Sequence, residues 1–263
     1  MERLDKELVN RRLVETRVKA QELIKNNLVL VNKKITAKSS VQIKDTDQIE
    51  IVDNERFKYV SRGGFKLEKA LQVFGYDMTG KSVMDIGSST GGFTDCCLQH
   101  GAKQMVCIDV GTDVMHKTLR GDSRVTLFEN TNFKDVDSSL FDGVDVVVAD
   151  VSFISLTKIF EKIHSCNVTI DAICLIKPQF ECGREIASKY SGVILNKNIH
   201  IDIINQLLEK LKSFGFVCLG LDFSPIKGGD GNIEYLGFFT NKSNKVNNIN
   251  VLDTVAKAFE NLK

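Results

Sequence analysis

Beyond residue 60, short apolar runs alternate with longer stretches in which apolar residues recur at helical spacing. The run 144–149 is almost entirely apolar, as is typical of a parallel strand covered on both faces. From 198 to 214, apolar side chains return every three or four residues, which predicts a helix with one buried side. This alternation predicts an α/β domain with a doubly wound, Rossmann-like sheet. Seven strands are expected at 82–86, 104–110, 125–129, 144–149, 170–176, 216–223 and 233–240, and four helices at 66–74, 93–100, 155–163 and 198–214.

The last two of these strands follow each other without a helical stretch between them. Their connection holds Gly228-Gly229-Asp230-Gly231, and glycine-rich loops of this kind join neighbouring antiparallel strands. We therefore expect a hairpin at one side of the sheet, with one antiparallel strand.

The first 55 residues have a different pattern. A short amphipathic helix is predicted near residues 4–9, and a second over 17–25 with Thr16 as its N-cap. Strands are predicted at 28–31 and 48–52, with a turn after the first. These elements predict a small α+β domain at 1–55, a connector at 56–60 and the larger domain at 61–263. The side chains expected to face inward in the small domain are Leu4, Leu8, Val9, Val18, Leu23 and Ile24.

Charge is distributed unevenly, although the formal net charge of the 263 residues is only +1. Residues 1–44 hold 11 lysines and arginines against five acids, whereas 45–55 hold five acids and no base. The basic segment could contact phosphate groups, or it could be the solvated side of a helix.

Composition excludes several classes of protein. The chain is 43% hydrophobic and 26% charged, which is ordinary for a globular protein and argues against disorder. The charged N-terminus predicts no signal peptide, and no apolar run approaches the ~20 residues of a membrane span. The seven cysteines form no Cys-x-x-Cys pair, so that neither a zinc site nor a disulfide framework is expected. We therefore expect a cytoplasmic protein with reduced thiols, no metal and a monomeric state.

The segment 83–93 joins a strand to a helix through a glycine-rich turn. It is neither a P-loop nor a Gly-x-Gly-x-x-Gly turn, and Asp85 suits a cation better than a pyrophosphate. S-adenosylmethionine has a sulfonium, an amino group and no phosphate. Asp109, 24 residues later, could accept hydrogen bonds from ribose hydroxyls, although alone it could equally cap a helix. The residues expected to bind this cofactor are Asp85, Gly87, Ser88, Ser89, Thr90, Gly91, Gly92, Phe93, Asp109, Val110, Asn130, Asn132 and Asp150.

Four charged residues lie at the ends of predicted helices and strands, next to apolar segments. Lys66 begins a helix, Asp150 and Lys177 end apolar strands, and Glu234 opens the last strand. The carboxyl ends of neighbouring parallel strands form the ligand crevice of such sheets. Two lysines and two carboxylates in one dry pocket suit the deprotonation of a weak acid such as a ribose hydroxyl. Ordinary surface ion pairs are the alternative.

The order of elements in the small domain resembles the RNA-binding domain of the fourth protein of the small ribosomal subunit. The likeness rests on Arg3-Leu4-Asp5, on Thr16-Arg17, Ala20 and Leu23-Ile24, and on Val29 and Val31-Asn32-Lys33. A small protein-binding cap is the alternative. The residues expected to contact RNA phosphates are Arg3, Arg11, Arg12, Arg17, Lys19, Lys33, Lys34 and Arg62.

The larger domain resembles the FtsJ-like 2′-O-methyltransferases, whose Lys-Asp-Lys-Glu tetrad corresponds to Lys66, Asp150, Lys177 and Glu234. The whole chain resembles the TlyA family. The resemblance implies methylation of cytidine 2′-hydroxyls in RNA of the large ribosomal subunit, and in some members also of the small subunit. The motifs that carry it are Ser61-Arg62-Gly63-Gly64-Phe65-Lys66-Leu67, Gly87-Ser88-Ser89-Thr90-Gly91-Gly92-Phe93-Thr94-Asp95, Asp109-Val110-Gly111, Asp150-Val151-Ser152-Phe153-Ile154-Ser155-Leu156 and Lys177-Pro178-Gln179-Phe180-Glu181.

The sequence departs from the family pattern at three places. Ser88 replaces an alanine, Thr112 stands where a tyrosine is frequent, and the connector reads Arg56-Phe57-Lys58-Tyr59-Val60 instead of Arg-Ala-Trp-Val. Two other functions stay open, because some members of the family are labelled haemolysins and a methyltransferase fold can be inactive. The intact tetrad argues against an inactive RNA-binding assembly factor. The lack of an apolar span or a strongly amphipathic basic helix argues against a membrane-active haemolysin.

Overall fold

The computed structural model describes residues 1–25, 28–51, 58–183, 186, 188, 190, 192–243 and 247–262. The chain forms two compact units, Met1–Lys58 and Tyr59–Lys263. Of the connector expected at 56–60, residues 56 and 57 lie outside the described residues.

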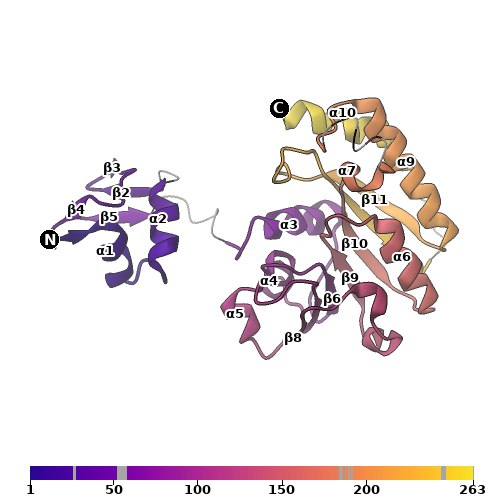
Figure 1. The fold of residues 1–263 in the computed structure, drawn as a ribbon, viewed down its shortest axis with the longest axis horizontal. Helices are drawn as coiled ribbons and strands as arrows, with labels where there is room; N and C mark the ends of the chain where they lie inside the picture. Colours follow the sequence, from indigo (N-terminus) through magenta and orange to yellow (C-terminus); the bar gives the residue numbers. More distant parts are fainter. Residues whose placement is uncertain are drawn as a thin grey trace. The chain divides into compact units, whose positions relative to one another are not determined.

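The N-terminal unit combines two helices with two small antiparallel sheets (Figure 1). Both helices and two of the strands were expected, whereas three two-residue strands are too short to show a pattern in the sequence. The elements are β1 (Glu2–Arg3), α1 (Leu4–Asn10), α2 (Arg17–Lys25), β2 (Val29–Val31), β3 (Lys34–Ile35), β4 (Gln42–Ile43) and β5 (Ile49–Ile51), with β1 paired to β4 and β2 lying between β3 and β5.

The core of this unit differs from the prediction at one residue. Leu4, Leu8, Leu23 and Ile24 are buried and Val9 is half-buried, but the prediction for Val18 is wrong, because its side chain is 76% exposed. Buried Ala20 belongs to the same side of α2 as Leu23 and Ile24, being three and four residues away from them. Val18 is two residues from Ala20, or about 200° around the helix, and therefore faces the opposite side.

The helix cap and the turn that the sequence predicts in this unit are both present. The backbone N–H of Lys19 donates to Thr16 Oγ1 at 3.2 Å, which is the predicted N-cap. Between β2 and β3, Asn32 and Lys33 both have positive φ, 51° and 64°. This is the backbone of a two-residue hairpin turn that matches the twist of the strands, and asparagine tolerates it well.

The larger unit is built on a seven-stranded sheet with the order β11-β12-β10-β9-β6-β7-β8. The predicted α/β fold and the hairpin are confirmed: β12 is antiparallel to both β10 and β11, and the other pairs are parallel. The strands are β6 (Ser82–Ile86), β7 (Gln104–Ile108), β8 (Val125–Phe128), β9 (Val146–Ala149), β10 (Asp171–Ile176), β11 (Val217–Phe223) and β12 (Tyr235–Thr240).

Helices cover both faces of this sheet (Figure 1). Alternate residues of a strand point to opposite faces, so that Val83 packs with α3 and α4, and Met84 packs with α6 and α9. One face carries α3 (Gly63–Phe74), α4 (Gly92–Gln99) and α5 (Lys117–Arg120), and the other carries α6 (Leu156–Ser165), α9 (Lys197–Ser213) and α10 (Val251–Asn261).

Two further findings concern the described residues as a whole. No helix among them is both long enough and apolar enough to cross a bilayer. Nor do the described His, Cys, Asp and Glu side chains form a group of three or more that could hold a metal ion.

Candidate functional site

The candidate active site lies where three parallel strands end and one antiparallel strand begins. Asp150 directly follows β9, and Lys177 directly follows β10. Glu234 precedes β12 and is not its first residue, which corrects the prediction that it opens the strand. Because β12 runs antiparallel to β10, its beginning lies at the edge of the sheet where β9 and β10 end. The topology therefore brings all three side chains to one place.

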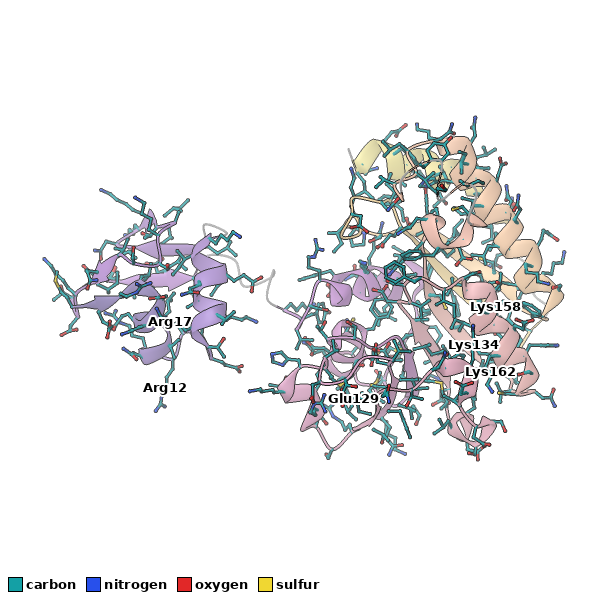
Figure 2. The ribbon with its side chains drawn as sticks, viewed as in Figure 1. Arg12, Arg17, Glu129, Lys134, Lys158 and Lys162 are labelled. Atoms are coloured by element: carbon teal, nitrogen blue, oxygen red, sulfur yellow. The ribbon has the colours of Figure 1, made fainter. Side chains whose placement is uncertain are left out.

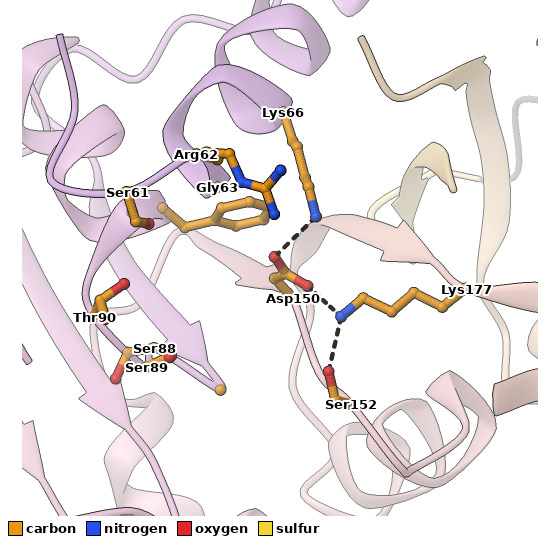
Figure 3. Close-up of a pocket in the computed structure, with 13 residues that line it drawn as sticks. Ser61, Arg62, Gly63, Lys66, Ser88, Ser89, Thr90, Asp150, Ser152 and Lys177 are labelled. Atoms are coloured by element: carbon orange, nitrogen blue, oxygen red, sulfur yellow. Dashed lines mark hydrogen bonds and ion pairs between the residues drawn. The ribbon is translucent and has the colours of Figure 1, made fainter. Parts of the chain in front are cut away.

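The four expected catalytic residues form a continuous chain of contacts, part of which Figure 3 shows. Lys66 Nζ lies 2.7 Å from Glu234 Oε2 and 3.7 Å from Asp150 Oδ2. On the other side of the same carboxylate, Lys177 Nζ lies 2.7 Å from Asp150 Oδ1. Asp150 is therefore shared by two ammonium groups, and alternating charges run across the pocket.

This cluster is largely withdrawn from solvent. The side chains of Lys66, Lys177 and Glu234 are 11%, 9% and 3% exposed. Burial raises the pKa of Glu234, and the nearby Lys66 and Lys177 partly oppose that rise. Paired charges that are both buried and clustered in a cavity differ from the surface ion pairs that were the alternative explanation.

Contacts of residues 59–64 fix the start of α3, and this start directs Lys66 into the pocket. The side chain of Tyr59 lies directly over Gly64, where a Cβ atom would come within 2.2 Å of the ring. The backbone N–H of Val60 donates to Asp95 Oδ2 at 2.7 Å, and Asp95 lies in the first turn of α4. Residues 59–64 are thus held on the helix that follows the glycine-rich turn.

The glycine-rich turn between β6 and α4 lines the same pocket as Lys66, Asp150 and Lys177, whereas Glu234 lies behind Lys66 and does not line it. Gly91 has a φ of 92°, which a residue with a side chain rarely adopts. At Gly92, a Cβ atom would lie 2.3 Å from Ser61 Oγ and 3.0 Å from the backbone nitrogen of Gly64. Only glycine at position 92 permits this close approach of the turn to residues 61–64. The cavity of about 280 Å³ is lined by Ser61, Arg62, Gly63, Lys66, Gly87, Ser88, Ser89, Thr90, Gly92, Phe93, Asp150, Ser152 and Lys177.

Asp85 lies behind this turn and not on the pocket wall. Its side chain is fully buried, and Thr94 Oγ1 donates to its Oδ2 atom at 2.6 Å. Burial raises the pKa of Asp85 to about 7. Asp85 Oδ1 and Ser88 Oγ are buried without a hydrogen-bond partner among the described residues. Unpaired acceptors of this kind, next to an open pocket, fit a ligand that brings donors or positive charge.

A second cavity of about 300 Å³ continues from the first, with Gly87, Ser89, Asp150 and Ser152 common to both. Asp109 and Val110 line it, as does Asn132. Asp109 accepts hydrogen bonds at 2.7 Å from the backbone N–H groups of Ser89 and Gly111, which fixes its carboxylate at the cavity wall. Asn130, which was also expected here, lines neither cavity. The other residues of the second cavity are Ile86, Ile108, Thr131, Phe133, Val151, Phe153, Ile154 and Ile159.

Two polar or aromatic residues next to Asp150 received no role from the sequence. Ser152 Oγ accepts a hydrogen bond of 2.9 Å from Lys177 Nζ. Phe153 is 90% exposed, has a φ of 64° and lies with its ring 5.0 Å from that of Phe180. Nothing in a linear pattern reports a left-handed phenylalanine, and only the motif context around Asp150 could have drawn attention to it.

The residues expected to contact RNA divide into two groups in the N-terminal unit. Buried Asp5 accepts hydrogen bonds from Arg3 at 3.0 Å, Arg17 at 2.9 Å and Gln21 at 2.7 Å, and these bonds lower its pKa. Arg11 pairs with Glu7 at 2.7 Å. Three of the expected arginines therefore also hold the fold together.

The other group in this unit is turned toward solvent. Arg12, Lys33 and Lys34 are exposed and form no ion pair within the described part of the chain (Figure 2 labels Arg12 and Arg17). Lys19 is half-buried. Arg62, in the larger unit, is exposed and lines the tetrad cavity. Arg12, Lys33, Lys34 and Arg62 can meet phosphate groups without breaking an ion pair within the described residues.

Comparison with known families covers both units. Residues 59–240 match the model of the FtsJ-like methyltransferases, and residues 2–49 match the S4 domain. These matches confirm the resemblance that the motifs indicated for each part of the chain.

Individual proteins are similar along most of the chain. Hemolysin A of Brachyspira hyodysenteriae is 44% identical over 90% of this chain and 99% of its own length. The 16S/23S rRNA (cytidine-2′-O)-methyltransferase TlyA of Mycobacterium tuberculosis is 35% identical over 89% of this chain and 87% of its own length. A solved structure of a candidate hemolysin from Streptococcus thermophilus is 37% identical, with a TM-score of 0.74, and covers 99% of this chain and 96% of its own.

Proposed function

This chain belongs to the FtsJ-like methyltransferase family and carries an N-terminal S4 domain, and on this premise we propose that it methylates the ribose 2′-hydroxyl of cytidine in ribosomal RNA. The methyl donor is S-adenosylmethionine, the substrate is RNA of the large subunit, with that of the small subunit as a second candidate, and the reaction belongs to the cytoplasm. The observation that carries the proposal is the buried Lys66–Asp150–Lys177–Glu234 cluster beside the glycine-rich turn.

The residues around the two cavities fit the cofactor. The unpaired oxygen of Asp85 lies behind the turn and that of Ser88 belongs to the turn, and Asp109 presents a fixed carboxylate to the second cavity. We assign the turn 87–93 to the amino-acid part of the cofactor and Asp109, Val110 and Asn132 to the nucleoside part. When bound, S-adenosylmethionine supplies an electrophilic methyl group on a positively charged sulfur.

We assign to Lys177 the removal of the proton from the acceptor hydroxyl. In its neutral form, the amine of Lys177 would accept the proton of the acceptor hydroxyl, whose oxygen would take the methyl group that S-adenosylmethionine would supply from its sulfur. Asp150 stabilises the ammonium that results, at 2.7 Å. Lys66 and Glu234 hold Asp150 from its other side, so that the carboxylate keeps one orientation.

Several features of the surface suit an RNA acceptor. Arg62 stands at the rim of the tetrad cavity with its guanidinium unpaired among the described residues. The exposed ring of Phe153 offers a face on which an unstacked base can lie. In the S4 domain, Arg12, Lys33 and Lys34 supply positive charge for the RNA backbone.

The names of the relatives support the choice of RNA. TlyA of Mycobacterium tuberculosis is named for 16S and 23S rRNA, and TlyA of Campylobacter jejuni, 32% identical to this chain, for 23S rRNA alone. The common element in the two names is a cytidine 2′-hydroxyl of the large-subunit RNA.

The test is methyl transfer from labelled S-adenosylmethionine to ribosomal subunits and to free ribosomal RNA, both from cells that lack this gene. We expect wild-type protein to label 23S RNA at a cytidine ribose, and Lys177→Ala to lose transfer while its affinity for S-adenosylmethionine is retained. Lys103→Ala is the matched control, because Lys103 is an exposed lysine outside both cavities. Wild-type turnover by Lys177→Ala would contradict the role given to Lys177.

The two other functions give different results in the same preparation. An inactive assembly factor would bind RNA without labelling it, even with subunits from the gene-deleted strain. A membrane-active haemolysin would lyse red cells at neutral pH without S-adenosylmethionine.

A further inference from the structure

Among the described residues, two oxygen atoms contact the amine of Lys177, and they contact it in different ways. Asp150 Oδ1 lies 2.7 Å from Nζ as an ion pair, yet no well-aligned hydrogen bond reaches this oxygen from the described residues. Ser152 Oγ lies 2.9 Å from Nζ and accepts a hydrogen bond from it, as Figure 3 shows. The hydroxyl of Ser152 therefore fixes the direction of one N–H bond of Lys177.

This direction matters only when Lys177 acts as a base. A neutral lysine amine has two N–H bonds and one lone pair, and rotation about its last carbon–nitrogen bond exchanges their positions. The negative charge of Asp150 disfavours a lone pair that faces it. With one N–H held by Ser152 and the lone pair turned away from Asp150, the remaining direction is the open cavity that both residues line.

We infer that Ser152 is a positioning residue, whose hydroxyl holds the neutral amine of Lys177 with its lone pair toward the acceptor hydroxyl. The inference rests on the proposed function, since it concerns the proton-transfer step of that reaction. It adds a residue outside the tetrad, from a segment where the sequence indicated only Asp150.

The backbone holds Ser152 in place for this role. The segment from Asp150 to α6 ends at Ser155, whose hydroxyl caps α6 and donates to Glu181 Oε2 at 2.5 Å. Glu181 Oε1 accepts the backbone N–H of Leu156 at 2.8 Å. Glu181 belongs to α7 (Pro178–Glu181), the short helix that begins immediately after Lys177.

The segments that carry Ser152 and Lys177 are therefore tied together at two levels. The half-buried carboxylate of Glu181 joins their far ends, and its removal from solvent raises its pKa. Nearer the pocket, the rings of Phe153 and Phe180 lie 5.0 Å apart. The 2.9 Å contact between Ser152 and Lys177 is thus set by a packed framework, although Ser152 itself is exposed.

The test compares Ser152→Ala and Ser152→Thr in the methyl-transfer assay with ribosomal subunits. We expect Ser152→Ala to lower kcat about tenfold, the change that corresponds to ~1.4 kcal/mol, the strength of one hydrogen bond. The KM for subunits, the Kd for S-adenosylmethionine and the Tm should stay at wild-type values, because Ser152 is exposed and the change affects only proton transfer. Ser152→Thr keeps the hydroxyl and should restore kcat to within about threefold.

Ser123→Ala, an exposed serine outside both cavities, is the matched control and should behave as wild type. An unchanged kcat in Ser152→Ala beside an active wild type would overturn the role of Ser152 and leave the proposed function intact. A raised kcat would also overturn it, since the hydroxyl would then be donating to the lone pair and blocking it. A wild-type protein that transfers no methyl group to RNA would overturn the proposed function, and this inference with it.

Discussion

Lys66 and Glu234 form a buried ion pair of 2.7 Å although 168 residues separate them in the chain. The pair joins α3, the first helix of the larger unit, to the residue directly before β12, its last strand. Both side chains are buried, so that removal of either one leaves the other as an unpaired charge away from solvent. The pair therefore connects the stability of the fold to the proposed active site. Their exposed fractions are 11% and 3%.

Breaking this pair should therefore destabilise the protein measurably. Lys66→Ala leaves the Glu234 carboxylate buried and without its nearest cation, which we expect to lower the free energy of unfolding by ~3 kcal/mol. In a double-mutant cycle with Glu234→Ala, the two losses should fall short of additivity by ~1–2 kcal/mol in urea denaturation. The exposed pair Lys257–Asp253 on α10 is the control, with an expected coupling below ~0.5 kcal/mol. Full additivity at Lys66 and Glu234 would show that the contact carries no energy.

Much of the sheet could be predicted from local patterns, and the reason lies in its burial. The strand that ends before Asp150 is covered on both faces, so that its residues Val146–Ala149 form a continuous apolar run. Glu234 shows where such reasoning stops. Its place beside Lys66 depends on the antiparallel direction of β12, and the length of the loop before it does not fix the first residue of the strand.

The contacts of charged residues were harder to predict from the sequence than the strands. The sequence shows a basic N-terminal segment but not which bases are already paired, because Asp5, Arg17 and Gln21 meet only once the helices have packed. The conformation of Phe153 could not be predicted either, because its residue type argues against a positive φ and its ring contact with Phe180 forms only in the folded chain.

Asp85 should make the stability of the protein depend on pH. Burial raises its pKa to about 7, so that between the ordinary pKa of an aspartate and this value the folded protein binds a proton that the unfolded chain has released. This contribution is complete at acidic pH and is lost as the pH rises through about 7. We expect the unfolding free energy of wild type relative to Asp85→Asn to fall by roughly 3–4 kcal/mol between pH 4 and pH 8. A difference that stays constant across this range would show that Asp85 has an ordinary pKa in the fold.

Two arginines of the N-terminal unit should respond differently to substitution. Arg12 is exposed and has no ion pair within the described residues, so Arg12→Gln should leave Tm unchanged and reduce the salt slope of RNA binding by about one. Arg17 donates to buried Asp5, so Arg17→Gln should lower the unfolding free energy of this unit by ~1 kcal/mol. RNA-binding titrations at several salt concentrations and thermal melts distinguish the two effects. Identical behaviour of the two variants would contradict the division into paired and free bases.

Substitution of Phe153 should lower activity without lowering stability. Its side chain is 90% exposed and its backbone is left-handed, a conformation that costs a phenylalanine of order 1 kcal/mol and that asparagine adopts readily. Phe153→Asn should therefore be at least as stable as wild type. Its kcat/KM for RNA should fall at least tenfold, because stacking of a base on an aromatic ring contributes ~1–3 kcal/mol. Phe153→Tyr keeps the ring and should retain activity, and the Kd for S-adenosylmethionine should be the same in all three proteins. Wild-type kcat/KM in Phe153→Asn would show that this ring does not contact the acceptor, and the left-handed backbone would then have to be explained by the packing against Phe180 alone.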